Sequence, residues 1–590
     1  MMPYPQQIVP RPKSVVAGSG YFQMNRRSCV ALDGDVAPQT ARALAEPLRR
    51  MTRLPWLIGH AGGSNFLVLE AVKNLPGIPH PAEGYHLIVT AAVARIRAVT
   101  PAGWRHGIQS LLDLLAPAGA GAWRWPCGEI RDWPDFSFRG VLVDPARKFI
   151  PRPKMLSTID DMARNKMNVL HVHFTDNEGF TLQNRRWPAL NERPYHPMFF
   201  RVPKGPFTLK ELGRLEADYA GVYSRSDVKT LVAYGQERGV QILPEVSMPS
   251  HCAPILRVFP ELKCQVDKGG TSETVMCIGN EKTYAVMEQL IDDIAPLFPY
   301  PVFHLGTDEI ECRDVLYQGR MFYCQRWDDC KVCRAAMQRH GYGHVRELFY
   351  DFVRRMRKHL AKHGKRLAIY NDYMDIAKPV PLPKDILVYF WRIAMKNRGP
   401  RSGCSFAKFL KAGYQIVNIN AWDTYIDEPQ LMKEKNLVRW HPTSRPYSPP
   451  ALKHLVTGGE LNVWCDHPEH YPRTIPPGMA VFADRVWNKA AIGDVPLFSR
   501  RLARHLFGPA FSGSLETVFE KFGGMISPRK AERPIARDEM TMPESAMRTK
   551  AECRELERGL RRELARGSVT NRRLIEELIE NSRAMGKNLP

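Results

Sequence analysis

The stretch FRGVLVDPARKFIPRPKMLSTIDDMARNKMNVLHVHF, residues 138–174, predicts a strand, a helix and a second strand in close succession. Its two ends, FRGVLVD and NVLHVHF, are short apolar runs rich in β-branched residues. Between them Met155, Ile159 and Met162 recur at the spacing of one helix face. Near-continuous apolar runs are typical of strands covered on both faces, so this unit predicts part of a parallel sheet.

The same alternation continues along the chain. Six further runs end in polar or aromatic residues: QILPEV (241–246), VFHLGTD (302–308), LAIYND (367–372), ILVYFW (386–391), QIVNIN (415–420) and ELNVWCD (460–466). Helices are predicted in the intervals, at residues 154–166, 226–234, 284–297, 345–363 and 404–412. Eight βα units in succession predict a (β/α)8 TIM barrel. A doubly wound open sheet is the alternative, disfavoured because no phosphate-cradling glycine loop follows the first strand.

Three regions are therefore expected in a chain of 590 residues. Residues 1–134 contain strand candidates such as FLVLEAV before a helix, which predicts a small N-terminal α/β domain. Residues 135–500 form the predicted catalytic barrel. Residues 501–590 lack strand patterns and predict a helical C-terminal extension. The fold class is thus α/β.

The overall composition is that of an ordinary globular protein, with 44% hydrophobic and 25% charged residues. The net charge of +23 raises nucleic acid as a partner, but the basic residues alternate with acids and show no basic stripe, so no nucleic-acid partner is expected. The sequence contains no apolar run of about eighteen residues, so no membrane span is predicted. The N-terminus shows no secretory signal, which predicts a cytoplasmic protein, although export stays open. The oligomeric state is left open.

Twelve cysteines without a visible signal indicate a reducing compartment. Cys312, Cys324, Cys330 and Cys333 lie close in sequence, and the last two have the Cys-x-x-Cys spacing of a zinc knuckle. No matching second knuckle exists, so free structural thiols are the favoured interpretation. A structural zinc site at these four cysteines is the alternative, and no cofactor is predicted.

Two adjacent carboxylates stand out in HLGTDEIE (304–311), where Asp308 and Glu309 follow the fourth strand. Chemistry in such barrels lies at the carboxyl ends of the strands, so the pair is expected at the mouth. A carboxyl pair usually cleaves glycosidic bonds from two sides, which neighbours on one strand suit poorly. They suit a substrate that supplies its own nucleophile, while one carboxyl protonates and the other orients. An ion-pair role for one acid is the plainer alternative.

Aromatic residues recur at the same ends of the later strands. Trp391 ends the sixth strand, Tyr425 follows the seventh and Trp464 ends the eighth, while Arg139 lies in the first. Sugars bind on apolar platforms flanked by forked hydrogen-bond donors. One such residue alone would more often belong to the core, but their recurrence predicts a sugar site.

These motifs together resemble glycoside hydrolase family 20, the β-N-acetylhexosaminidases. The segment from FRGVLVD to FTDNEGF resembles the opening of that family's catalytic domain, and HLGTDEIE resembles its His-x-Gly-Gly-Asp-Glu signature. PEVSMPSH, GGELNVWCD and AVFADRVWN resemble later segments, and VPRPKSV and GYHLIVT resemble the preceding domain. The resemblance covers residues 8–500 in order.

The resemblance implies a retaining exo-glycosidase that hydrolyses terminal β-linked N-acetylhexosamine, GlcNAc or GalNAc, through the substrate's 2-acetamido group. An amino-sugar oligosaccharide or glycoconjugate would be the substrate. Glu309 matches the general acid/base, and Asp308 matches the carboxylate that orients the acetamide. Tyr425 matches the hydroxyl that bonds the acetamide oxygen, and Arg139 the residue that holds the ring hydroxyls.

Further binding residues follow from the same resemblance. Trp391 and Trp464 match walls of the acetamide pocket, and Asp176 and His251 match a polar pair that tunes the acid. The implied substrate-binding set also includes Tyr370, Asp427 and Asp466.

The chain departs from the family pattern at several positions. Thr307 stands at a glycine of the signature, where a β-branched residue restricts the backbone. Ser247 and Ser250 replace an aspartate and a glycine, Tyr370 replaces a tryptophan of the pocket, and Asp466 replaces a glutamate. Activity is expected because the acid pair and Tyr425 remain. A catalytically impaired carbohydrate-binding relative is the alternative.

Overall fold

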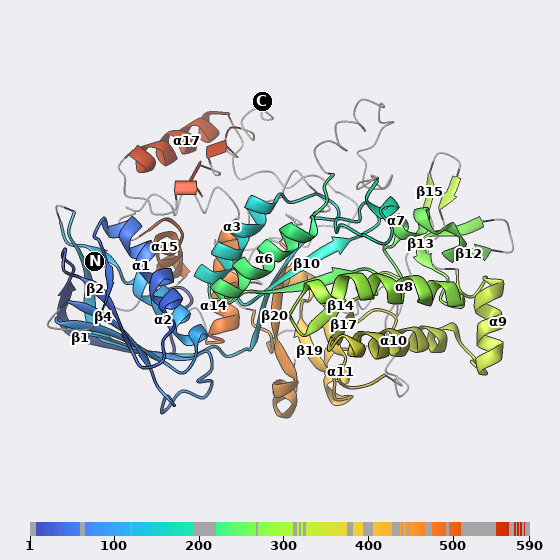
Figure 1. Cartoon of the computed structure of the whole chain (residues 1–590), viewed down its shortest axis with the longest axis horizontal. Coiled ribbons are helices and arrows are strands. Elements are labelled where there is room, and N and C mark those ends of the chain that lie inside the picture. Colours follow the sequence, from blue (N-terminus) through green and yellow to red (C-terminus); the bar gives the residue numbers. More distant parts are fainter. Residues whose placement is uncertain are drawn as a thin grey trace, which may run out of the picture.

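A computed structural model gives the arrangement of the chain (Figure 1). The structure describes residues 8–59, 65–119, 121–192, 220–266, 270–310, 315–317, 320–322, 326–374, 382–392, 405–426, 437, 440–444, 446, 448–465, 475–490, 495–508 and 550–565, with scattered positions between 572 and 583. The N-terminal domain lies at one end of the molecule and the barrel occupies the centre (Figure 1).

The N-terminal domain is a mixed sheet with two helices. Its main strand order is β1-β8-β5-β6-β4-β2-β3, with β7 paired to β8. The strands are β1 (Ser14–Gln23), β2 (Cys29–Asp33), β3 (Leu57–Gly59), β4 (Phe66–Ala71), β5 (Tyr85–Val89), β6 (Val93–Ala98), β7 (Ala116–Pro117) and β8 (Trp123–Asp132). Helices α1 (Pro38–Thr52) and α2 (Pro101–Asp113) pack on the sheet through a shared apolar core. The expected small α/β domain is therefore present.

A closed parallel barrel of eight strands follows, which confirms the predicted fold class. The strands in order are β9 (Phe138–Val143), β10 (Val169–Thr175), β11 (Gln241–Val246), β14 (Val302–His304), β17 (Arg366–Tyr370), β18 (Leu387–Phe390), β19 (Gln415–Asn418) and β20 (Val456–Val463). β20 pairs with β9 and closes the ring. Each of the eight predicted runs overlaps one of these strands.

Helices cover the outside of the barrel. They include α3 (Arg152–Arg164), α6 (Arg225–Arg238), α8 (Glu281–Ile294), α10 (Val345–Lys362), α11 (Phe406–Lys411) and α14 (Ile475–Trp487). Their ends follow from local sequence. Ser224 and Asp227 form a capping box at the start of α6, and Gly239, with φ of 76°, ends it in the left-handed conformation.

Short elements lie on the connections. They are α4 (Ala189–Glu192), α7 (Ala253–Val258), α9 (Lys331–His340), α12 (Ala421–Thr424), the hairpins β12 (Lys263–Val266) with β13 (Gly270–Met276) and β15 (Val315–Tyr317) with β16 (Arg320–Phe322), and three 3-10 turns at Pro260–Leu262, Ala295–Leu297 and Pro450–Leu455. The two hairpins and α9 lie at the end of the molecule away from the N-terminal domain (Figure 1).

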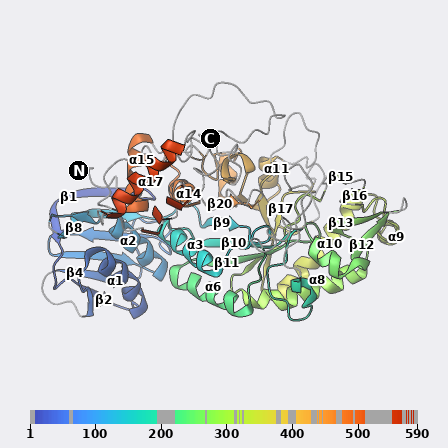
Figure 2. The same cartoon turned by 90° about the horizontal axis from the view of Figure 1, so that it is seen from above.

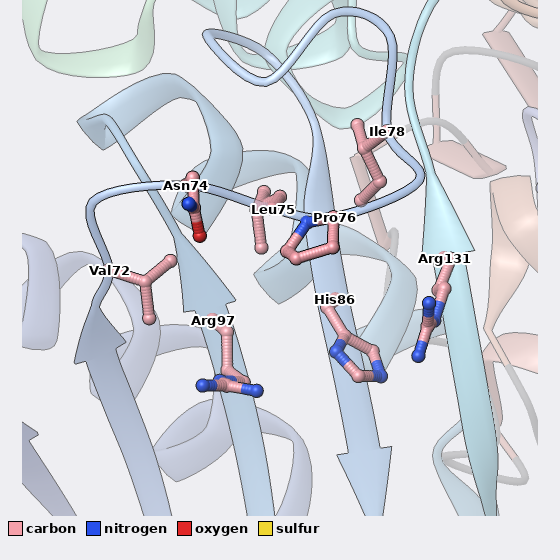
Figure 3. Close-up of a pocket in the computed structure, with 8 residues that line it drawn as sticks. All are labelled: Val72, Asn74, Leu75, Pro76, Ile78, His86, Arg97 and Arg131. Atoms are coloured by element: carbon pink, nitrogen blue, oxygen red, sulfur yellow. The ribbon is translucent and has the colours of Figure 1, made fainter.

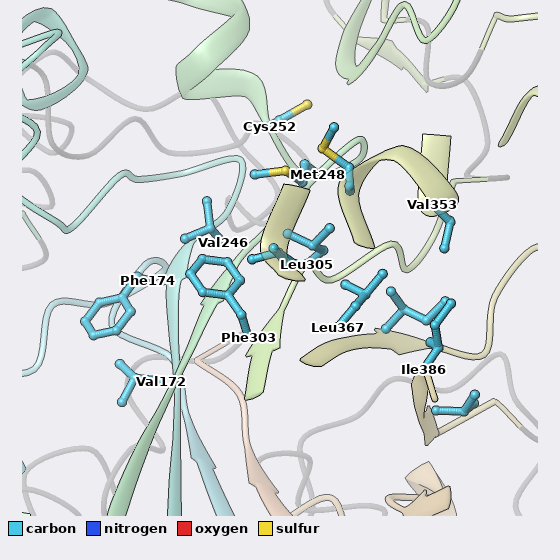
Figure 4. Packing of buried hydrophobic residues seen from close by; sticks show 14 of the residues in the cluster. Val172, Phe174, Val246, Met248, Cys252, Phe303, Leu305, Val353, Leu367 and Ile386 are labelled. Atoms are coloured by element: carbon cyan, nitrogen blue, oxygen red, sulfur yellow. The ribbon is translucent and has the colours of Figure 1, made fainter. Parts of the chain in front are cut away.

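The main core lies between the strands and the covering helices. Val172 and Phe174 of β10 point into this layer, as do Val246, Phe303 and Leu367 on the neighbouring strands (Figure 4). The alternate residues of β10 point into the barrel, where they meet charged partners. This alternation is why the strand contains histidines within an apolar run.

The N-terminal domain is joined to the barrel through buried polar contacts. Nζ of Lys166, fully buried, lies 3.2 Å from Oδ2 of Asp132 and 2.8 Å from Oγ of Ser110. Nε1 of Trp487 donates to Oδ1 of the same Asp132 at 2.9 Å. A buried ion pair thus joins the barrel to the sheet.

Helix α15 (Val495–Phe507) contains residue 500, where the sequence predicts the start of the C-terminal extension. His505 of this helix contacts Asp113 at 3.0 Å and Asn165 at 3.1 Å, so α15 belongs to the junction between the two domains. Helix α17 (Lys550–Ala565) overlaps α15 in the view of Figure 2 but lies apart from it in Figure 1. Within the described residues, no helix has the length and apolarity needed to cross a membrane.

Candidate active site

The acid pair lies on a tight turn at the carboxyl end of β14. The strand ends at His304, and the backbone then adopts positive φ at Gly306 (68°), Thr307 (76°) and Glu309 (49°). This turn leaves the Asp308 side chain 13% exposed and the Glu309 side chain 46% exposed. The sequence predicted a strand through residue 308. The turn ends it earlier, because left-handed residues cannot continue a strand.

Thr307 is strained in this turn. A β-branched residue rarely adopts a φ of 76°, and its hydroxyl is buried without a hydrogen-bond partner among the described residues. Thr307 therefore occupies a backbone conformation that glycine would adopt at lower cost.

A chain of polar contacts leads from the acid pair into the barrel. Nε2 of His251 lies 3.4 Å from Oε2 of Glu309 and 3.6 Å from Oδ2 of Asp308. Nδ1 of the same ring lies 3.0 Å from Oδ1 of Asp176. Burial alone would lower the pKa of His251, but the charges of Asp176 and Asp308 hold it well above its ordinary value. The predicted pair of Asp176 and His251 therefore does lie beside the acids.

The two acids have opposite tendencies to ionise. Burial raises the pKa of Asp308 to about 6, against the charge of His251. Burial also acts to raise the pKa of Glu309, but the hydrogen bond from His251 and the charges of His251 and Arg392 hold it below its ordinary value. Oδ1 of Asp308 is buried with no hydrogen-bond partner in the described part of the chain. An acceptor of this kind is available to an N–H group of a ligand.

Aromatic rings form a box next to these acids. Trp391 stacks on Tyr425 with centroids 6.4 Å apart and 15° between the planes. Tyr425 meets Trp464 at 6.1 Å, and Trp464 meets Tyr370 at 6.5 Å. The predicted platform residues thus gather at one end of the barrel, although they come from four different strands.

Tyr370 forms part of the box wall with its hydroxyl turned inward. It is buried, and its hydroxyl donates to Oε2 of Glu245 at 3.1 Å. Glu245 also meets Nδ1 of His173 at 2.8 Å and Nε2 of His171 at 3.2 Å. Burial acts to raise the pKa of Glu245, but the charges of His173 and His304 and the hydrogen bonds from His171 and His173 hold it well below its ordinary value. This buried charged network forms the floor beneath the site.

Arg139 does not lie where the prediction placed it. Its side chain is 0% exposed and lies at the start of β9, the end of the barrel opposite to the acids. Nη1 donates to Oε2 of Glu83 at 3.1 Å and to the Phe136 carbonyl at 2.8 Å, and Nε donates to the Lys166 carbonyl at 2.9 Å. Arg139 therefore joins the barrel to the N-terminal domain and does not reach a sugar at the mouth.

Arg147 holds the position that was assigned to Arg139. It follows the carboxyl end of β9, where Nη2 lies 2.7 Å from Oδ2 of Asp176 and Nη1 lies 2.8 Å from Oδ2 of Asp144. Its guanidinium also lies over the Trp464 ring at 5.1 Å. The sequence contained a signal for this residue, because side chains that follow a barrel strand lie at the mouth and those that begin it do not.

Asp372 and Arg392 are two further site residues that the sequence did not reveal. Oδ1 of Asp372 lies 3.0 Å from Nη1 of Arg392, whose Nη2 is 3.9 Å from Oε1 of Glu309. Asp372 also accepts a hydrogen bond from Nε1 of Trp391. Burial raises the pKa of Asp372 to about 7, against the charge of Arg392.

The serine departures have structural roles. The hydroxyl of Ser247 is buried and donates to the Thr175 carbonyl at 2.9 Å. The hydroxyl of Ser250 donates to the Asp308 carbonyl at 2.6 Å. Ser250 thus steadies the backbone of the acid turn. Asp427 and Asp466 lie outside the described residues.

The cysteine group differs from the predicted one. Cys330 and Cys333 do lie together, but with Cys264 and Cys277. Cys312 and Cys324 lie outside the described residues. Cys264 and Cys277 were missed because more than fifty residues separate them from the knuckle in sequence.

A separate cavity of about 240 Å³ lies on the N-terminal domain (Figure 3). Its basic side chains are His86, Arg97 and Arg131. Each is already paired, since His86 and Arg131 meet Glu129 at 2.8 and 2.9 Å and Arg97 meets Glu70 at 3.0 Å. The barrel mouth is therefore the better candidate site.

Two family models match the chain. Residues 136–490 match "Glycosyl hydrolase family 20, catalytic domain", and residues 5–133 match "Glycosyl hydrolase family 20, domain 2".

Curated relatives are named β-hexosaminidases. A β-hexosaminidase of Porphyromonas gingivalis is 27% identical over 530 residues, covering 84% of this chain and 62% of the relative. The chain thus spans less than two thirds of that protein's length. A β-hexosaminidase of Akkermansia muciniphila is 26% identical over 446 residues, covering 72% of this chain and 83% of the relative.

Solved structures share the fold. The chitobiase of Flavobacterium johnsoniae superposes with a TM-score of 0.68 at 21% identity, covering 98% of this chain and 92% of that one. The β-N-acetylhexosaminidase of Bacteroides fragilis gives 0.67 at 22% identity, covering 85% and 95%. With both family models matching in order, this chain belongs to glycosyl hydrolase family 20.

Proposed function

We propose that this protein is a β-N-acetylhexosaminidase, a retaining exo-glycosidase that releases terminal β-linked N-acetylhexosamine with the substrate's acetamido group as nucleophile. One observation carries the proposal. The unpartnered buried carboxylate oxygen of Asp308 lies beside Glu309 at the mouth, next to the aromatic box. Substrate-assisted hydrolysis is a known property of family 20, which departs from the usual two-carboxylate scheme.

In the first step the acetamide carbonyl oxygen attacks the anomeric carbon. The bond from that carbon to the leaving oxygen breaks, and Glu309 gives its proton to this oxygen. Oδ1 of Asp308 accepts the amide N–H, which aligns the carbonyl and stabilises the positive charge of the cyclised intermediate. In the second step Glu309 takes a proton from water while the water oxygen attacks the anomeric carbon. The bond from that carbon to the acetamide oxygen breaks, which opens the ring formed in the first step.

Glu309 has to be protonated to act as the acid, but the site without a sugar favours its ionised form. Its pKa is held low by His251 while its side chain faces solvent. A sugar bound over the half-exposed carboxyl would remove water from it and raise its pKa. The neighbouring His251 ring is a source of this proton, because the charge of Asp176 keeps the ring protonated.

The remaining groups position the sugar. Trp391, Tyr425 and Trp464 offer faces against which the acetamide methyl and the ring pack. Nε1 of Trp464 is buried without a partner among the described residues and can donate to the ligand. Arg147 lies over Trp464 and is held there by Asp144 and Asp176, which places its charge beside the bound sugar.

The alternative of a carbohydrate-binding relative without turnover is not favoured, because both acids and the contact with His251 are in place. Hydrolysis of a nitrophenyl N-acetylglucosaminide separates the two. Glu309→Gln should lower kcat/KM by roughly 10²- to 10⁴-fold. Glu288→Gln is the matched control, because Glu288 pairs with Arg355 on the outside of the barrel.

A thiazoline that mimics the cyclised intermediate should inhibit the wild type competitively. A wild type that binds N-acetylglucosamine but hydrolyses no member of a broad substrate panel would support the alternative. Full activity of Glu309→Gln would exclude Glu309 as the acid, and indifference to the thiazoline would argue against the acetamide as nucleophile.

A further inference from the structure

Four buried cysteine side chains meet at the end of the barrel away from the N-terminal domain. Cys264 lies in β12, and Cys277 directly follows β13. Cys330 is the N-cap of α9, and Cys333 lies in its first turn. All four are at most 1% exposed, and their sulfur atoms lie within 4.8 Å of one another.

The sulfur positions match a tetrahedron. The Sγ atom of Cys277 lies 3.5 Å from that of Cys333 and 3.7 Å from that of Cys330, and Cys264 lies 4.0 Å from Cys333. A zinc ion with four thiolates at about 2.3 Å would place its ligands about 3.8 Å apart. A disulfide would need about 2.05 Å. The spacing therefore fits a shared ion and not a bonded pair.

The local backbone also fits thiolate ligands. Cys330 and Cys333 lie at the N-terminus of a ten-residue helix, where unpaired N–H groups stabilise negative charge on sulfur. Cys330 has no side-chain capping hydrogen bond. A Cβ at Gly279 would lie 2.6 Å from Cα of Cys333, so only glycine lets the segment after Cys277 approach the knuckle this closely.

We propose that Cys264, Cys277, Cys330 and Cys333 bind a structural zinc ion. Thiolate sulfur favours zinc among the common divalent cations. Four protein ligands leave no open coordination position, so the ion is structural and takes no part in catalysis. Cys330 and Cys333 supply the knuckle, and the β12–β13 hairpin supplies the other two ligands.

The ion would join two connections that lead to the acid site. Two backbone hydrogen bonds join the hairpin to the loop that holds His251. The Met276 N–H donates to the Pro249 carbonyl at 2.8 Å, and the Cys252 N–H donates to the Thr274 carbonyl at 3.1 Å. Helix α9 follows the connection after Asp308 and Glu309. Nε1 of Trp327, just before α9, donates to the Met276 carbonyl at 2.8 Å. The four cysteines are thus positioning residues for the contact between His251 and Glu309, a consequence that rests on the proposed function.

Metal analysis of the full chain, purified without chelators, tests the site. Mass spectrometry of the metals should give about one zinc per chain, and X-ray absorption should show about four sulfur neighbours at about 2.3 Å. Cys277→Ser should lose most of the zinc. Cys127→Ser is the matched control, a buried cysteine in β8 of the N-terminal domain, and should retain it.

Chelation of zinc from the wild type should lower Tm, because the bound ion stabilises only the folded chain. A metal-free wild type, iron in place of zinc, oxygen or nitrogen ligands, or a disulfide between two of the four would each overturn the proposal. Should Cys277→Ser fail to fold, the wild-type metal content and absorption spectrum still decide it. An inactive wild type that contains zinc would count against the proposed function and leave the zinc site standing.

Discussion

Nε2 of His251 lies 3.4 Å from Oε2 of Glu309, so the proposed acid lies against an imidazole. The carboxylate of Asp176 holds the other ring nitrogen at 3.0 Å. The proton affinity of Glu309 therefore depends on a residue two contacts away.

Asp176→Asn should narrow the pH profile of kcat/KM. Without the carboxylate, His251 loses the charge that holds its pKa high, so the ring loses its proton at lower pH. The alkaline limb should move to lower pH, and kcat should fall roughly tenfold. Asp292→Asn is the control, because Asp292 forms a similar pair with His359 at 2.7 Å on the outside of the barrel. A uniform loss of rate with an unchanged profile would show that Asp176 only supports the fold.

Asp308→Asn should stabilise the folded protein above pH 6. The folded pKa of Asp308, about 6, exceeds its ordinary value of 3.8, so the folded chain binds this proton more tightly than the unfolded chain. The wild type therefore loses stability as the pH rises from about 4 to 6. The asparagine variant avoids this loss of stability, which amounts to about 3 kcal/mol at pH 7.5, but it loses activity. Unfolding should be measured at pH 4 and pH 7.5, and a difference that does not change with pH would contradict the assignment.

Thr307→Gly should raise the stability of the protein. The substitution removes a β-branched side chain at a φ of 76° and a buried hydroxyl without a described partner. The expected gain in the free energy of unfolding is about 1 kcal/mol. Thr158→Gly is the control, a buried threonine within α3 that should be destabilised by the same change. A loss of stability in both variants would mean that the turn does not strain Thr307.

The two buried arginines of the first barrel strand and its loop should differ in their effect on KM. Arg147→Met should raise KM strongly, because Arg147 lies beside Trp464 at the mouth. It should also lower Tm, because it leaves Asp144 and Asp176 buried without their cation. Arg139→Met should leave the partly buried Glu83 without its cation and cost roughly 1–3 kcal/mol of stability. KM of its folded fraction should match the wild type. Denaturant unfolding and steady-state kinetics on both variants would decide the case, and a raised KM for Arg139→Met would restore the original assignment.

The strands of the barrel could be predicted because each one is covered on both faces and leaves a continuous apolar run. Their ends were less predictable. β14 stops at His304, four residues before the predicted end, because the three left-handed residues that follow depend on the fold around them. β20 starts at Val456, four residues before the predicted start, in a glycine-containing stretch that carries little strand pattern.

The site was predictable where a residue follows a strand and less so elsewhere. Asp308, Glu309, Trp391 and Trp464 lie at the mouth for this reason. Arg139 was misplaced because it begins its strand, whereas Arg147 follows it. The cysteine quartet was only half visible, because two of its members lie on a hairpin that only the fold brings to the knuckle.

The buried contact between Lys166 and Asp132 limits how this chain can be divided. A fragment that begins at the barrel would keep the ammonium group and lose the carboxylate, and Trp487 would lose the same acceptor. The barrel is therefore not suited to transfer on its own. In protein engineering or gene rearrangement, the N-terminal sheet domain has to be kept together with the barrel.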